Sequence, residues 1–163
     1  MNAHLSIDLV NFDRAGLGGT IGKTLKCVSW PERQASECTW QLEIIWEGGT
    51  AWTVRSKPTM TESGHEMGAL QIEESHESSL SPDFIRAIMP IDDFVLAGYR
   101  IASALENNVI LDCAISLIDG GGRELVISTA PASGAVSLCR WGEPRPKTEF
   151  DPSSFVWGLE VTK

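Results

Sequence analysis

Apolar and polar residues alternate in many short stretches of this chain, and Gly or Pro separates one stretch from the next. Two of these stretches, 40–46 and 111–117, each run into an acidic Gly-rich turn and continue beyond it as a second apolar stretch. In both cases a proline stands six positions after the first apolar residue beyond the turn, and a Gly-Ala-apolar segment follows. A period of two is typical of half-buried strands, and this repetition indicates a duplicated β-unit.

The pattern predicts a mainly β protein, an antiparallel sandwich or barrel-like fold built from two related β-units with one short helix between them. At 163 residues the chain is long enough for one domain with a substantial core. The order expected within this single domain, 1–163, is a first β-unit over 20–75, a linker with the short helix over 76–94, a second β-unit over 95–141, and a Pro-rich C-terminal tail with a docking segment over 142–163.

The two hairpins predict a strand register. A three-residue loop at Gly48, Gly49 and Thr50 puts the large apolar side chains on one face and the charged ones on the other, wetter face. The pairs expected in the first hairpin are Trp46 with Trp52, Ile44 with Val54, and Glu43 with Arg55. Those expected in the second hairpin are Leu117 with Leu125 and Ile115 with Ile127.

The remaining segments carry weaker signals. Ser81 is a candidate N-cap and Pro82 suits the first helical position, which predicts a helix over 84–89 stopped by Pro90. Residues 93–105 are expected to form a strand, because Gly98 aligns with Gly22 of the first unit. Residues 16–20 are expected to form a loop on composition. The candidate docking residues of the tail are Phe155, Val156, Trp157 and Leu159.

The net charge of −9 is unevenly distributed. No basic residue stands between Lys57 and Arg86, and the acids in this interval are Glu62, Glu66, Glu73, Glu74, Glu77 and Asp83. Nucleic-acid binding needs a basic surface for the phosphates, so this balance argues against it. A basic protein partner is compatible with it. The alternative is an edge strand and a loop that the glutamates merely keep in solution.

Six tryptophans are many for this length. Trp40, Trp46 and Trp52 share one face of the first hairpin and are expected in the core. Trp30, Trp141 and Trp157 stand beside Gly or Pro near strand ends, where either the edge of the core or a partner surface explains them. The residues predicted to bind a partner are therefore Glu62, Glu66, Glu73, Glu74, Glu77, Trp30 and Trp141.

No catalytic motif is complete. The segment 16–24 resembles the phosphate-binding loop of P-loop nucleotide hydrolases, but Leu17 stands where that loop needs Gly, and a strand pattern follows it where a helix is required. His65 and His76 stand eleven positions apart in a polar segment and do not have zinc-ligand spacing. We therefore predict no catalytic residue, no cofactor and no metal.

The four cysteines are far apart and form no C-x-x-C pair, and Cys113 and Cys139 lie in apolar strand patterns where a buried free thiol is expected. The N-terminus has no basic region followed by a long apolar run. Together these features predict a protein of the cytoplasm that does not associate with membranes.

Three functions fit these observations. The leading hypothesis is a non-enzymatic acidic module that binds a basic protein, in one version an immunity or antitoxin protein that masks a basic toxin. The first alternative is a small-molecule-binding protein or small enzyme with a pocket between the two β-halves, in which His65, Glu66 or Asp112 would meet. The second is a subunit of a homo-oligomer, for example a homodimer, whose edge strands pair with another copy.

Overall fold

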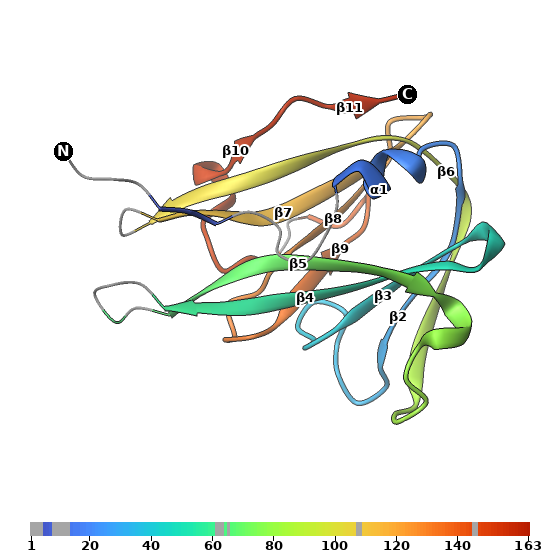
Figure 1. Ribbon diagram of the computed structural model, residues 1–163, viewed down its shortest axis with the longest axis horizontal. Coiled ribbons are helices and arrows are strands. Elements are labelled where there is room, and N and C mark those ends of the chain that lie inside the picture. Colours follow the sequence, from blue (N-terminus) through green and yellow to red (C-terminus); the bar gives the residue numbers. More distant parts are fainter. Residues whose placement is uncertain (1–4, 8–13, 61–63, 65, 107–108, 145–146) are drawn as a thin grey trace.

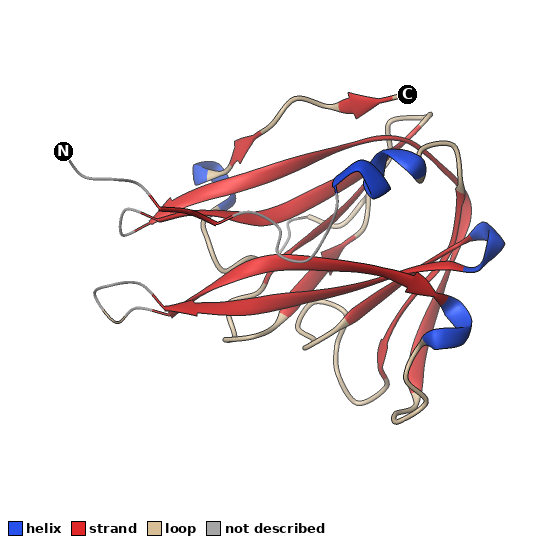
Figure 2. Ribbon diagram, in the orientation of Figure 1, coloured by secondary structure: helices blue, strands red, loops and turns tan. Residues whose placement is uncertain are grey.

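The architecture is described from a computed structural model, which describes residues 5–7, 14–60, 64, 66–106, 109–144 and 147–163. It is mainly β, as predicted, and strands occupy most of the described chain (Figure 2). Among the described residues there is one short α-helix, α1 (Arg14–Gly19). Three single-turn 3-10 helices accompany it, η1 (Glu47–Gly49), η2 (Glu77–Ser79) and η3 (Pro152–Ser154).

Eight strands follow one another in a single sheet, each antiparallel to the next. The first four are β2 (Thr24–Pro31), β3 (Leu42–Trp46), β4 (Thr50–Met60) and β5 (Glu66–His76). The second four are β6 (Arg86–Glu106), β7 (Val109–Asp119), β8 (Glu124–Thr129) and β9 (Val136–Cys139). Their order across the sheet is β5-β4-β3-β2-β6-β7-β8-β9, so each group of four is an antiparallel meander, and the two groups meet where β2 pairs with β6.

The long strand β6 folds this sheet into two layers. Its residues 86–95 pair with β2, and its residues 96–106 pair with β7. Near the end of the first part Asp93 adopts a φ of 54°, and the strand curves around one side of the molecule (Figure 1). The outermost strands, β5 and β9, do not pair with each other, so the barrel-like alternative does not close.

The layers enclose the main core, in which Trp46, Trp52 and Phe94 are the largest fully buried side chains. Short strands extend the sheet beyond the meanders: β1 (Leu5–Ile7) runs parallel to β7, whereas β10 (Val156–Trp157) and β11 (Val161–Thr162) pair with β6. The tail thus pairs with β6 through Val156 and Trp157, whereas Leu159 is 93% exposed.

The predicted register is confirmed in the second hairpin and wrong in the first. Leu117 pairs with Leu125 and Ile115 with Ile127. In the first hairpin the pairs are instead Leu42 with Val54, Glu43 with Thr53 and Ile44 with Trp52. The turn is longer than three residues because η1 is part of it. A shift of two residues keeps every side chain on its expected face. That face is not uniformly wet, because Glu43 is fully buried there whereas Arg55 is exposed.

Two local predictions are wrong. Residues 84–89 form no helix, since β6 begins at Arg86 and pairs with β2 from its first residue. The ladder with β2 satisfies more backbone groups than one or two helical turns ending at Pro90 can. Residues 16–20 belong largely to α1 instead of a loop, and Leu17 is held there by burial in the main core. The strand expected over 93–105 is confirmed by β6.

Candidate functional site

The predicted acidic residues do not form one patch. Glu62 lies outside the described residues. Glu66 begins β5, and Glu73 and Glu74 stand seven and eight positions later, which at about 3.3 Å per residue places them about 23 Å or more away. Glu77 follows directly in η2. We call Glu73, Glu74 and Glu77 the acidic end of β5.

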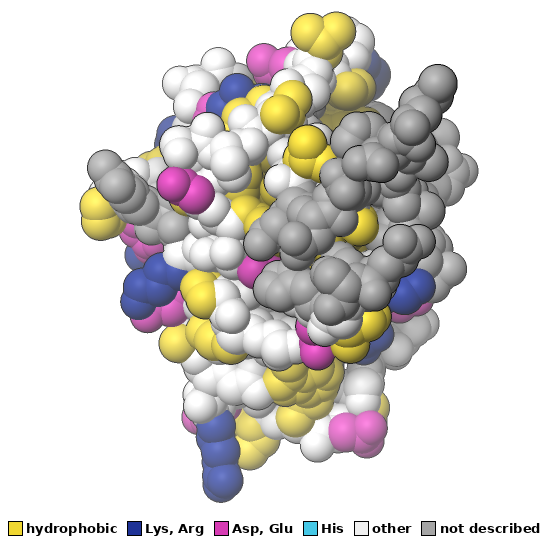
Figure 3. All heavy atoms as spheres, turned by 90° about the vertical axis from the view of Figure 1, so that its left-hand side faces the viewer, with side chains coloured by type: hydrophobic (Ala, Val, Ile, Leu, Met, Phe, Trp, Pro, Cys, Tyr) yellow, Lys and Arg dark blue, Asp and Glu magenta, His cyan; other side chains and the backbone are white. Residues whose placement is uncertain are grey.

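Glu66 lies at the other end of β5, where charges are mixed. Its Oε1 accepts a hydrogen bond from Ser133 Oγ at 2.5 Å, which ties the strand to the turn between β8 and β9. The face shown in Figure 3 looks onto this side of the molecule, and among its described residues acidic side chains are interspersed with basic ones. Glu66 therefore acts as a local tether and not as part of a continuous acidic surface.

The acidic end of β5 is exposed and weakly neutralised. All three glutamates are exposed. Arg55 Nη1 lies 3.8 Å from Glu73 Oε2, with both side chains about half exposed, whereas Glu74 and Glu77 make no ion pair within the described part of the chain. Such an exposed pair contributes little to stability, and it leaves most of the negative charge of this surface available to a partner.

The backbone at the acidic end also faces outward. The amide of Gly68 donates to the carboxylate of Glu149 at 3.0 Å, so it points away from β4, and the pairing of β5 with β4 is unbroken from 66 to 76. In an antiparallel ladder every second residue directs its N–H away from the partner strand, so the amides of Glu74 and His76 also point away from β4. Toward the strand's middle Leu70 and Ile72 are fully buried, so the exposed edge is the stretch 73–76.

Trp30 and Trp141 are not part of this surface. The indole N–H of Trp30 donates to the carbonyl of Gln34 at 3.0 Å, and β3 and β4 separate its strand β2 from β5. Trp141 stacks on Phe94, with ring centroids 5.8 Å apart, and the guanidinium of Arg123 lies 4.6 Å from its ring centroid. Both indoles are partly buried against the main core, so each has a packing role that the sequence did not distinguish from partner binding.

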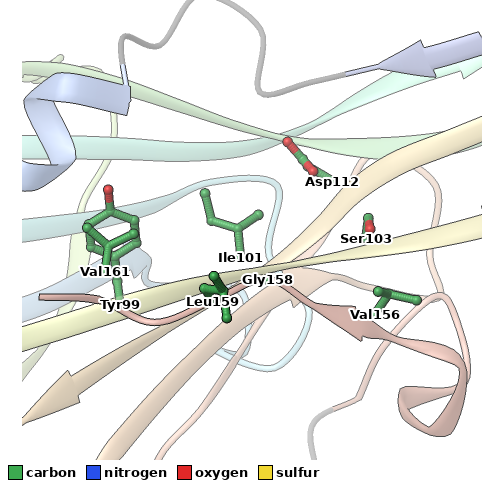
Figure 4. Close-up of a pocket in the computed structure, with 8 residues that line it drawn as sticks. All are labelled: Tyr99, Ile101, Ser103, Asp112, Val156, Gly158, Leu159 and Val161. Atoms are coloured by element: carbon green, nitrogen blue, oxygen red, sulfur yellow. The ribbon is translucent and has the colours of Figure 1, made fainter.

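A hollow of about 350 Å³ lies between β6, β7 and the C-terminal tail. Its lining is Tyr99, Ile101, Ser103, Asp112, Val156, Gly158, Leu159 and Val161 (Figure 4). Asp112 is one of three residues expected to meet in a pocket; Glu66 does not line this hollow, and His65 lies outside the described residues. The lining comes from the second meander and the tail. The hollow therefore does not lie between the two β-halves, where the pocket was expected.

Sequence reasoning did not anticipate Tyr99 at this hollow. Tyr99 is only 5% exposed, stands one residue after Gly98, and is the only tyrosine of the chain. Alternation along 99–103 places Tyr99, Ile101 and Ser103 on one face and is readable from the sequence. That the tail lies beside this face depends on packing between distant segments.

The cysteines are free thiols, and Cys113 and Cys139 are buried as predicted. Burial, together with the negative charges of Asp112 and Glu149, raises the pKa of Cys113 to about 12. A thiol with so high a pKa is a poor nucleophile at neutral pH. Within the described residues, no three His, Cys, Asp or Glu side chains gather as a metal site would require.

Comparison with known proteins finds no matching family model, curated protein or solved structure. None of the helices in the described ranges has the length and apolar character needed to cross a bilayer.

Proposed function

We propose that this protein is a non-enzymatic, acidic protein-binding module, and that a basic partner docks on the acidic end of β5. The observation that carries the proposal is the coincidence of three exposed glutamates with an outward-facing stretch of edge strand at 73–76. An immunity or antitoxin protein that masks a basic toxin is one version of this function, supported by the charge alone.

The physical basis has two parts. A negative surface accelerates the approach of a positive partner, and salt screens this effect over about 10 Å at 0.1 M. An exposed strand edge then offers main-chain donors and acceptors to an extended segment of the partner. Pairing with a second copy of this chain at the same place is opposed, because it would bring two acidic ends together.

Charge reversal tests the first part. The tagged protein is used to capture its partner from the cell of origin, and association kinetics are then measured across a salt series. We expect a basic partner, and we expect the triple variant Glu73→Lys, Glu74→Lys, Glu77→Lys to slow association about tenfold or more at low salt. The matched control is Glu32→Lys, Asp92→Lys, Glu160→Lys, because both triples bring the formal net charge from −9 to −3.

The control triple reverses exposed acids outside the acidic end, so we expect it to slow association far less. An acidic partner, the absence of any captured protein, or equal effects of the two triples would each contradict the proposal. Unfolding midpoints of all three proteins establish that the reversals act on association and not on folding.

A backbone substitution tests the second part. Glu74→Pro removes an outward amide and leaves the ladder between β5 and β4 with its donors. We expect Glu74→Pro to weaken the complex much more than Glu74→Gln, which removes the same charge and keeps the amide. If both substitutions weaken the complex equally, the partner recognises only the side-chain charges and does not pair with the strand edge.

We also propose that the two meanders are copies of one ancestral unit. They share strand number and antiparallel order, and they meet through their first strands, β2 and β6. Superposition of 20–75 on 95–141, strand for strand, tests this origin.

A further inference from the structure

The C-terminal tail forms one wall of the hollow described above and is held by a few specific contacts. Val156 and Trp157 pair with Ser103 and Ala102, and the amide of Gly158 donates to the carbonyl of Ile101 at 2.8 Å. The guanidinium of Arg100 lies 4.6 Å from the ring centroid of Trp157. The tail therefore lies beside β6 as a strap of short paired segments (Figure 1).

Gly98 allows the second of these segments to approach β6. A side chain at this position would place its Cβ 2.7 Å from the carbonyl oxygen of Val161 and 3.1 Å from Thr162 Cγ2. The first contact is closer than real Cβ atoms come and is with backbone, which cannot move away alone, and the second is tighter than most real Cβ contacts. The tail wall thus depends on the absence of a side chain at Gly98.

The lining combines an apolar body with one acidic group. Five of its side chains are apolar or aromatic, namely Tyr99, Ile101, Val156, Leu159 and Val161. Ser103 adds a hydroxyl, and Asp112 adds a carboxylate that is only 8% exposed. Figure 4 shows these side chains on β6, β7 and the tail around the same space. A mainly apolar cavity with a few polar groups is the usual composition of a small-molecule site.

We propose that this hollow binds a small organic amine with an apolar body. An ionised carboxylate only accepts hydrogen bonds, whatever other contacts it makes, so a head group that reaches Asp112 must be a donor. A protonated amine supplies both the donor and the opposite charge, and charge-assisted bonds are the stronger ones. A carboxylate head group would instead bring two negative charges together. The volume of about 350 Å³ limits the ligand to a small molecule.

The site is separate from the acidic end of β5, since none of its lining residues belongs to that strand or to η2. A negative result for amine binding would therefore not contradict the proposed protein partner, and a negative result for the partner would not contradict amine binding.

Three probes that share an apolar chain and differ in head group test the proposal: hexylamine, hexanol and hexanoate. Binding is followed by amide chemical shifts of the full-length protein in solution. We expect hexylamine to shift the amides of 99–103, 112 and 156–162, and to bind about tenfold more tightly than hexanol. We expect hexanoate to bind most weakly. Absence of shifts at about 20 mM hexylamine, or hexanol or hexanoate binding as tightly as hexylamine, would overturn the proposal.

Two variants locate the binding. Asp112→Asn is expected to weaken hexylamine about tenfold and hexanol less than threefold. Gly98→Val is expected to displace the tail wall and weaken both probes, whereas Gly120→Val, at a glycine with open space around it, leaves both affinities unchanged. Equal responses of hexylamine and hexanol to Asp112→Asn would refute the role of the carboxylate. If that variant does not fold, the order of the three head groups on the unmodified protein decides.

Discussion

The buried ion pair between Glu43 and Arg86 yields the sharpest test of how this fold is held together. Arg86 Nε lies 2.8 Å from Glu43 Oε1 and 2.9 Å from Oε2, and Gln41 Nε2 donates to Oε1 at 3.1 Å. The side chain of Glu43 is completely buried, and that of Arg86 is 20% exposed. The pair joins the first hairpin to the first residue of β6.

Removing Arg86 leaves a buried carboxylate without its cation. Breaking a buried pair in this way costs about 3–5 kcal/mol, and we expect about 3 kcal/mol for Arg86→Met because Arg86 is partly exposed. For a chain of this length that corresponds to a fall in Tm of about 6–12 °C. Replacing both partners, Glu43→Leu with Arg86→Met, removes the uncompensated charge and is expected to restore most of the lost stability.

The assay is urea unfolding followed by tryptophan fluorescence, with the two single variants and the double variant forming a thermodynamic cycle. The matched control is Glu37→Gln, because Lys147 Nζ lies 2.9 Å from Glu37 Oε1, almost the same separation, yet these side chains are 64% and 52% exposed. We expect that control to cost less than about 1 kcal/mol. If the double variant loses as much as the two single variants together, burial does not couple the pair and the reasoning is refuted.

Three further predictions concern the core, the pH dependence and the thiols. Trp46→Ala is expected to cost about 3–5 kcal/mol, but Trp46→Phe less than about 1.5 kcal/mol, because the buried indole N–H has no hydrogen-bond partner within the described residues; equal midpoints in urea would contradict this. Burial alone would raise the pKa of Asp119, but the hydrogen bonds and charge of Arg123 more than offset burial and hold the pKa below its usual value. The stability that ionised Asp119 contributes is complete above the unfolded pKa of about 3.9 and is lost as the pH falls through the lower folded pKa. The free energy of unfolding of Asp119→Asn is therefore expected to fall less steeply with decreasing pH in this acidic range. Cys38 is exposed and is expected to react with a thiol reagent in the folded protein, whereas Cys113 reacts only on unfolding; mass spectrometry of the labelled protein shows the order.

Local pattern was sufficient for most of the strands, but not for the start of β6, and for one of the two registers. The second hairpin follows the alternation on both sides of Asp119 and its glycines, and the turn there is closed by bonds from Gly121 and Arg123 to the Asp119 carboxylate. In the first hairpin the faces were predicted correctly and the partners were not, because η1 lengthens the turn. A period of two fixes which side of a strand is apolar, and only the turn geometry fixes the register.

Which residues come together at the candidate sites was less predictable from the sequence than the strands were. The sequence shows that 58–85 lacks basic residues, yet it does not show that Glu66 and the acidic end lie at opposite ends of one strand. It shows Gly98 and the tail, but not that they touch. Both facts arise from pairing between segments far apart in the chain, which local propensity does not record.

Glu43 illustrates the division most directly. From the sequence alone it is a charged residue in an alternating strand, and the alternation correctly places it on the face opposite Trp46. That Glu43 itself is buried there, and that Arg86 at a separation of 43 residues supplies the cation, is decided by the tertiary structure, in which the chain returns into β6 beside β2. The strand period and the turns are properties of neighbouring residues, so the sequence by itself determined them. Burial and ion pairing depend on which distant segment covers a face, and only the tertiary structure decided that.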